Sequence, residues 1–228
     1  MKPHAWLFRF MALGALVATT VCVGRVGISQ ARENPRHRVA SLPAIPFLEA
    51  VALGFREAAA DLAWMQAVQY YGEHRQGDND LGEFGHFLDA VNTLDPRYEH
   101  AYIFGAVVLA TDLKDLDGAL DLLRRGARAN PQSPKFPFEM GFLTYVTGGD
   151  TDAAIRWFGL AARHPEGRER ALRFQAYLNR RLGRLETAWM LWHDVLQQTD
   201  NPALRVVARE NLRRIETGLR TRRPEGTP

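Results

Sequence analysis

The chain has 228 residues, enough for one domain and a further segment. Apolar residues make up 46%, which allows a continuous core, and the single cysteine, Cys22, excludes an intrachain disulfide. Residues 47–120 hold 13 acids and 4 bases, a net charge of −9, whereas residues 160–228 hold 8 acids and 14 bases, a net charge of +6. Such a division gives an elongated molecule a dipole that can orient a partner, although surface charge also serves solubility.

Residues 1–31 predict a targeting segment outside the folded domain. An uncharged run extends from Phe10 to Gly24, shorter than the roughly 20 residues of a membrane helix, but snorkelling of Arg9 and Arg25 would let residues 5–29 span a bilayer. We expect an N-terminal hydrophobic anchor helix, single-pass in a bacterial inner membrane, with the remaining domain in the periplasm. A cleaved signal that leaves a secreted, periplasmic protein is the alternative, and the positive-inside rule alone would favour a cytoplasmic domain.

Prolines at three positions predict an extended linker over residues 32–46. Helix is expected to begin after Pro46, and X-Pro pairs later in the chain predict breaks between helices. One or two helices should cover residues 47–74. The helices that follow are expected over about 81–94, 98–111, 116–129, 135–147, 151–163, 168–182, 184–199 and 202–217. The polar tail, residues 217–228, is expected to be disordered.

Three alanines recur at intervals of 35 and 34 residues, namely Ala119, Ala154 and Ala188. Four residues after each alanine stands a bulky apolar residue: Leu123, Phe158 or Trp192. Seven residues after each stands a small or short one: Gly126, Ala161 or Val195. A period near 34 is typical of repeated helix pairs, in which small residues let the paired helices approach and bulky residues fill the gap to the next pair.

This pattern resembles the tetratricopeptide repeat. The unit over about 134–166 matches it best, with Phe138 as first-helix aromatic, Met140-Gly141 after it and a turn at Gly149-Asp150. The resemblance implies an all-α fold, a right-handed α-solenoid of stacked antiparallel helix pairs over residues 47–216. We expect a divergent unit over about 60–97, units over about 98–131, 134–166 and 168–200, and a capping helix over 202–217.

The resemblance also implies a scaffold for protein–protein interaction, with the first helix of each pair lining a concave groove for the partner. On the helix over 168–182, four residues recur at intervals of 3, 4 and 3 and share one face next to Arg181: Arg170, Arg173, Tyr177 and Arg180. This cationic face suits a protein or peptide partner, and in particular an acidic one, through forked arginine hydrogen bonds. An ordinary solvated helix face is the alternative.

Other kinds of site find little support in the sequence. Motifs for nucleophilic catalysis and nucleotide binding are missing, so neither an enzyme nor a cofactor is expected. His74, His86 and His100 lack the spacing of metal ligands, and no metal site is expected. The arginines alternate with acids, which makes nucleic-acid binding unlikely. Two other functions stay open: a scaffold subunit of an envelope polymer-modifying enzyme complex, and a soluble cytoplasmic repeat protein.

Overall fold

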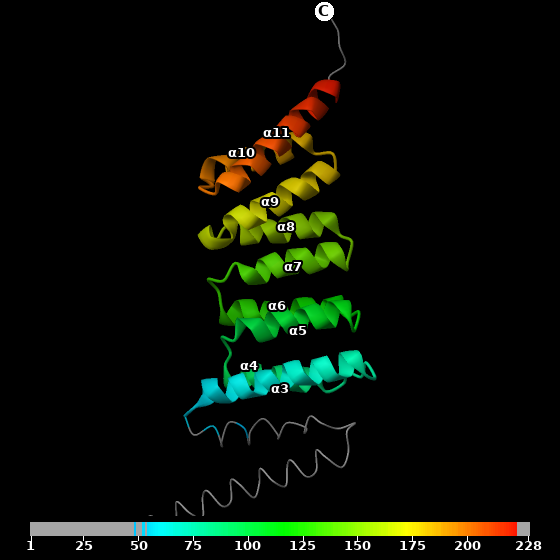
Figure 1. The fold of residues 1–228 in the computed structure, drawn as a ribbon, viewed down its shortest axis with the longest axis vertical. Helices are drawn as coiled ribbons and strands as arrows, with labels where there is room; N and C mark the ends of the chain where they lie inside the picture. Colours follow the sequence, from blue (N-terminus) through cyan, green and yellow to red (C-terminus); the bar gives the residue numbers. More distant parts are fainter. Residues whose placement is uncertain (1–47, 49–51, 53, 223–228) are drawn as a thin grey trace, which may run out of the picture. The chain divides into compact units, whose positions relative to one another are not determined.

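A computed structural model describes residues 48, 52 and 54–222, all of which belong to one compact unit over residues 44–228. The expected anchor segment (1–31) lies outside the described residues, as does the expected linker (32–46). The described residues form helices and short connectors without a strand (Figure 1). The helices are α3 (Arg56–Gln76), α4 (Phe84–Leu94), α5 (Glu99–Thr111), α6 (Leu116–Ala129), α7 (Lys135–Val146), α8 (Thr151–Ala161), α9 (Pro165–Arg181), α10 (Leu185–Gln198) and α11 (Pro202–Arg222).

Local sequence explains where several of these helices begin and end. Asp115 and Asp150 cap α6 and α8, each accepting a hydrogen bond at 2.8 Å from the backbone N–H three residues on. Gly149 and Gly183, which follow α7 and α9, have φ of 70° and 74°, a left-handed conformation that glycine adopts without steric cost. Helices α7 and α9 are therefore each followed by a glycine that suits a chain reversal.

The helices pack as consecutive pairs, α3 with α4, α5 with α6, α7 with α8 and α9 with α10, and α11 covers α10. Each pair also contacts the next, because the second helix of one pair packs on the first helix of the following pair. Among the first helices, α7 also touches both α5 and α9. The stacked helix pairs expected from the 34-residue period are confirmed (Figure 1).

The nine residues that define the period lie in the core. Trp192 is 5% exposed, Gly126 is buried, and the other seven are 0% exposed: Ala119, Leu123, Ala154, Phe158, Ala161, Ala188 and Val195. A Cβ at position 126 would lie 2.2 Å from Cε1 of Phe136, so only glycine permits this crossing of α6 and α7. Small residues thus set the distance between helices, as the spacing predicted.

Helices α9 and α11 are longer than predicted, whereas α4 is shorter and begins at Phe84 instead of about residue 81. Helix α9 begins at Pro165, earlier than the expected residue 168, because proline's fixed φ suits a first helical turn. Helix α11 continues to Arg222, so the expected disorder from residue 217 was wrong for residues 217–222. Leu219 packs against the core of the last two units and holds this extra turn in place.

None of the described helices combines the length and the apolar character needed to cross a membrane. The membrane anchor predicted within residues 1–31 lies outside the described part of the chain and stays a prediction.

Candidate partner-binding face

The first helices α7 and α9 carry a composite surface, here called the α7–α9 face. It consists of eight residues of these two helices that are exposed or half-buried: Glu139, Phe142, Val146, Arg170, Arg173, Tyr177, Arg180 and Arg181. The five residues predicted from the sequence are the members on α9, and all five are exposed or half-buried. The opposite side of α9 is buried through Ala171, Leu172, Ala176 and Leu178.

Aromatic residues of α7 position two of the α9 arginines. The guanidinium carbon of Arg170 lies 3.8 Å from the ring centre of Phe138. Arg181 donates a hydrogen bond to the hydroxyl of Tyr145 and lies 5.8 Å and 6.0 Å from the ring centres of Tyr145 and Tyr177. A guanidinium over an aromatic ring is held by electrostatic attraction, so these two side chains have defined positions.

The other two arginines of the row, Arg173 and Arg180, are exposed, and their guanidinium groups make no hydrogen bond or ion pair with any described residue. They stand seven residues apart on α9, about 10 Å along the helix. Arginine presents five donors in a planar fork that matches a carboxylate. These side chains therefore offer two cationic contacts that the described part of the chain does not itself use.

Apolar side chains border the arginines. On α7, Phe142 is 36% exposed and Val146 is 55% exposed, and on α9 Tyr177 is 40% exposed. The Phe142 ring lies 6.3 Å from that of Phe174, edge to face, which fixes its orientation. Phe142 and Val146 were not predicted from the sequence, because α7 is apolar on nearly every side and no polar stripe marks its outer face. Phe142 and Val146 stand three and seven residues after Glu139, and this helical spacing was the sequence signal that could have placed them on the same face.

Glu139 is the acid of the α7–α9 face. Partial burial raises the pKa of its carboxyl group above the usual range, and the positive charge of Arg170 only partly opposes this shift. A carboxylate in such a place is costly to keep charged. The electrostatic character of the face therefore comes mainly from its four arginines.

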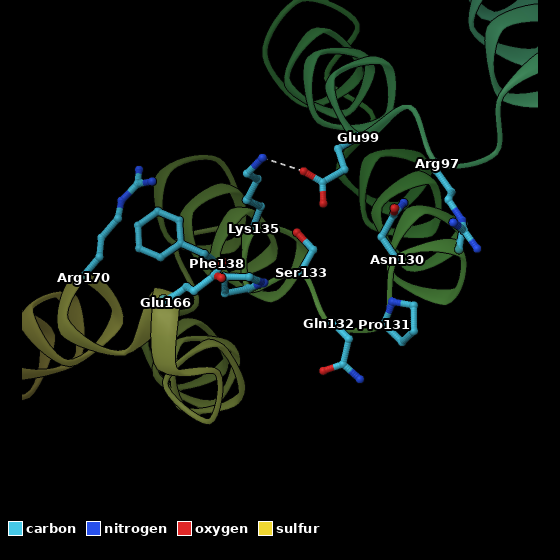
Figure 2. Close-up of a pocket in the computed structure, with 13 residues that line it drawn as sticks. Arg97, Glu99, Asn130, Pro131, Gln132, Ser133, Lys135, Phe138, Glu166 and Arg170 are labelled. Carbon is cyan, nitrogen blue, oxygen red and sulfur yellow. Dashed lines mark hydrogen bonds and ion pairs between the residues drawn. The ribbon is translucent and has the colours of Figure 1, made fainter. Parts of the chain in front are cut away.

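A pocket of about 760 Å³ adjoins the face, where the connector between α6 and α7 meets the first turns of α5, α7 and α9 (Figure 2). Arg170 and Phe138 line it and so join it to the α7–α9 face. Across the pocket, Lys135 Nζ contacts Glu99 Oε2 at 2.5 Å. Partial burial opposes ionisation of Glu99, but the hydrogen bond from Lys135 lowers its pKa. The pocket is lined by residues of both charges, which suits the polar backbone and charged side chains of a ligand.

The described residues bring no three metal-binding side chains together. His74 instead contacts Asp78, with 2.7 Å between Nδ1 and Oδ1. Several aromatic residues are internal and pack between helices: the ring centre of Phe158 lies 5.1 Å from those of both Phe138 and Phe174. Trp64 contacts Phe104 across α3 and α5, with 5.6 Å between ring centres. These aromatics hold helices together and leave few rings for a ligand.

No protein-family model matches the chain, and no curated protein is significantly similar to it. Among solved structures, TTC0263, a thermophilic tetratricopeptide repeat protein of Thermus thermophilus, is 20% identical, with a TM-score of 0.45 over 72% of this chain and 94% of that one. YrrB, described as a tetratricopeptide repeat protein with an unusual peptide-binding site, is 16% identical, with a TM-score of 0.43 over 81% and 97%. Yeast Tom70 is 15% identical, with a TM-score of 0.39 over 79% of this chain and 44% of its own.

These likenesses are distant, so the assignment of the fold depends on the helix pairs and on the residues buried between them. The pairs recur at the predicted period, the small residues lie where helices cross, and α11 closes the last pair. Over the described residues, the chain is an all-helical array of four stacked helix pairs, and the last pair is covered by one further helix, α11.

Proposed function

We propose that this chain is a non-enzymatic scaffold that binds a protein or peptide partner through the α7–α9 face. The observation that carries the proposal is the pairing of two kinds of surface in one place. Arg173 and Arg180 are exposed without an ion pair to the described residues, and exposed apolar side chains of Phe142 and Val146 lie on the neighbouring helix. Contacts of this kind are what protein interfaces use: arginine and aromatic side chains contribute most of the affinity.

The partner is expected to present carboxylates next to an apolar side chain. Carboxylates would pair with Arg173 and Arg180, and the apolar group would cover Phe142 and Val146. Two further arginines, Arg170 and Arg181, are already oriented by rings and would lose little conformational freedom on binding. The charge of the last third of the chain, a net +6 over residues 160–228, would attract such a partner over a longer distance.

We also propose that residues 1–31 tether the scaffold to a bacterial inner membrane, with the array in the envelope. The support is the sequence alone: a basic start, then the uncharged run over residues 10–24. A tethered chain stays with the membrane fraction after washes with high salt and with carbonate. Release of the intact chain by carbonate would contradict the tether but not the partner-binding face.

Photo-crosslinking in cells tests the face directly. A photoreactive phenylalanine analogue at position 146 is expected to capture a specific partner, since Val146 is 55% exposed on the α7–α9 face. Met190 of α10 is the matched control position, because it is 56% exposed but lies on a second helix.

Capture of a discrete product at position 146 and not at position 190 supports the proposal. Equal products at both positions, or a product at position 190 alone, would assign binding elsewhere on the array.

A further inference from the structure

The first helices α3, α5, α7 and α9 follow one another along the array (Figure 1), and the α7–α9 face occupies only the last two. Helix α7 touches both α5 and α9, and aromatic rings of α3 pack on α5. A partner on the α7–α9 face therefore lies next to the surface of α5 and α3. The charge and polarity of that surface decide which partner can extend along the array.

Ring contacts show which side of α3 adjoins α5. Trp64 and Tyr71 of α3 lie 5.6 Å and 5.1 Å from Phe104 of α5, measured between ring centres. Burial raises the pKa of the Tyr98 hydroxyl at the start of α5, and the negative charge of Asp61, three residues before Trp64, adds to this rise. Asp61 therefore stands on the side of α3 that adjoins α5.

This side of α3 presents two acids that no described base neutralises. Glu57 and Asp61 stand one turn apart, and both side chains are exposed. Neither makes an ion pair with a described residue, whereas Arg75, farther along the same side, pairs with Asp112, with 3.5 Å between Nε and Oδ1. Two carboxylates one turn apart on a helix repel each other. A cation from another molecule would relieve this repulsion.

Apolar side chains fill the surface between these acids and the α9 arginines. On α3, Met65 and Val68 are 66% and 42% exposed. On α5, Ile103 and Val107 stand one turn apart and are half-buried, on the side opposite the buried Gly105. The exposed apolar side chains of the α7–α9 face continue this surface. The whole is here called the first-helix track, which adds to the α7–α9 face Glu57, Asp61, Met65, Val68, Ile103 and Val107.

The length of the first-helix track limits the segment that can span it. Packed helices lie about 8–10 Å apart, so the three steps from α3 to α9 amount to about 24–30 Å. An extended chain rises about 3.3 Å per residue, so about eight or nine residues connect the acids with the arginines. A helical segment of the same reach would need about 18 residues. A short extended peptide therefore reaches both charged ends at once.

We propose, on the basis of the proposed function, that the partner is an extended segment with opposite charges at its two ends and that it binds along the first-helix track in one orientation. Its carboxylates pair with Arg173 and Arg180 on α9, its basic side chains pair with Glu57 and Asp61 on α3, and its apolar side chains cover α5 and α7. A segment placed the other way round would bring like charges together at both ends, so the track selects the orientation by charge.

Fluorescence anisotropy with a labelled synthetic peptide tests this surface. The probe is an extended peptide of about 12 residues, with two lysines at one end, two glutamates at the other and leucines and serines between them. The purified full-length chain in nonionic detergent is expected to bind it saturably. A control peptide of the same composition, in which lysines and glutamates alternate, is expected to bind at least about tenfold more weakly.

Charge reversals at the two ends test the orientation. Glu57→Arg with Asp61→Arg on α3 should weaken binding of the probe at least about fivefold, and Arg173→Glu with Arg180→Glu on α9 should do the same. The chain with all four substitutions keeps its net charge and exchanges the two ends, so the probe should turn round and bind within about twofold of its original affinity. Recovery also shows that the substitutions leave the array folded.

Asp117→Arg with Asp121→Arg is the matched control for the α3 reversal. These acids are also exposed and one turn apart near the start of a helix, but they lie on the second helix α6. This control makes the same change in net charge and should leave the affinity within about twofold.

Loss of binding for the α9 reversal but not for the α3 reversal would overturn the orientation and leave the proposed function standing. Equal losses for the α3 reversal and its α6 control would overturn it too, as would failure of the fourfold variant to recover. An unchanged affinity for both end reversals would contradict the proposed function as well. No saturable binding of the probe would overturn the charge pattern inferred for the partner, whereas capture at position 146 tests the α7–α9 face separately.

Discussion

Helices α9 and α11 both present a row of exposed arginines, but their surroundings differ. The α9 arginines lie beside aromatic residues of a neighbouring first helix, and two of them contact those rings. On α11 the arginine contacts stay within the helix or its own connector: Arg214 pairs with Glu210 at 2.9 Å, and Arg205 donates to the Thr199 carbonyl. Beneath the α11 row lie aliphatic residues of the core instead of rings: Leu204, Ala208, Leu212 and Ile215.

Under the proposed function, a row of positive charge is not enough to make a binding surface. An arginine row on a capping helix keeps an end helix in water. A similar row becomes a composite surface when a second helix adds rings that orient some arginines and apolar side chains that border the others. Substitutions in the α9 row, in the aromatic layer beneath it and in the α11 row test whether the neighbouring rings make one row a partner-binding face and leave the other solvated.

The largest expected effect comes from the aromatic layer beneath the α9 row. Phe158 is 0% exposed and packs against Phe138 and Phe174. Phe158→Ala should lower the free energy of unfolding by about 3–5 kcal/mol, because the surrounding side chains cannot fill the cavity that the missing ring leaves. Urea unfolding followed by circular dichroism measures the loss.

Phe142→Ala, at a ring that is 36% exposed, is the control and should cost about 1 kcal/mol or less. Similar losses for the two variants would mean that the aromatic layer does not support α9 in the way described.

A smaller effect is expected at Arg170, which stacks on Phe138. Arg170→Ala should lower the free energy of unfolding by about 0.5–1 kcal/mol, the usual contribution of an exposed cation–π contact. Arg173→Ala removes an exposed arginine without such a contact and should stay within about 0.5 kcal/mol of the unaltered chain. Equal values for the two variants would show that ring contacts do not distinguish these arginines.

The smallest effect concerns Glu139 and depends on pH. Because burial raises the pKa of this carboxyl in the folded chain, the folded state holds the proton more tightly than the unfolded state, and stability falls as pH rises through this range. Glu139→Gln should therefore raise the thermal midpoint at neutral pH, and the gain should shrink as pH falls towards the ordinary carboxyl pKa of about 4.3.

The unaltered chain, measured over the same pH range, is the reference for this comparison. A gain for Glu139→Gln that persists at acid pH would contradict burial as the cause.

The sequence predicted the helices well because their ends depend on local chemistry. Aspartates at the helix starts, left-handed glycines and X-Pro pairs mark chain reversals without reference to the rest of the fold. The end of α11 was predicted too early, because the contact that extends it, Leu219 on the core, connects residues far apart in sequence.

The candidate site was only half predictable for the same reason. Spacing of three and four residues placed the α9 arginines on one face, since that depends on one helix alone. The ring beneath Arg170 and the tyrosine bonded to Arg181 belong to α7, 32 and 36 residues away, and the way the two helices pack decides which side chains meet. Val146 became part of the site only through that packing.

The most direct test of the central claim is the affinity for the partner captured at position 146, measured by biolayer interferometry for two matched charge reversals. Arg173→Glu with Arg180→Glu on α9 should weaken binding at least about tenfold, equivalent to about 1.4 kcal/mol. Arg209→Glu with Arg213→Glu on α11 makes the same change in net charge and should alter affinity less than about twofold, because long-range attraction alone contributes little to it. Equal losses for the two double variants, or no loss for the α9 pair, would contradict the α7–α9 face as the binding surface.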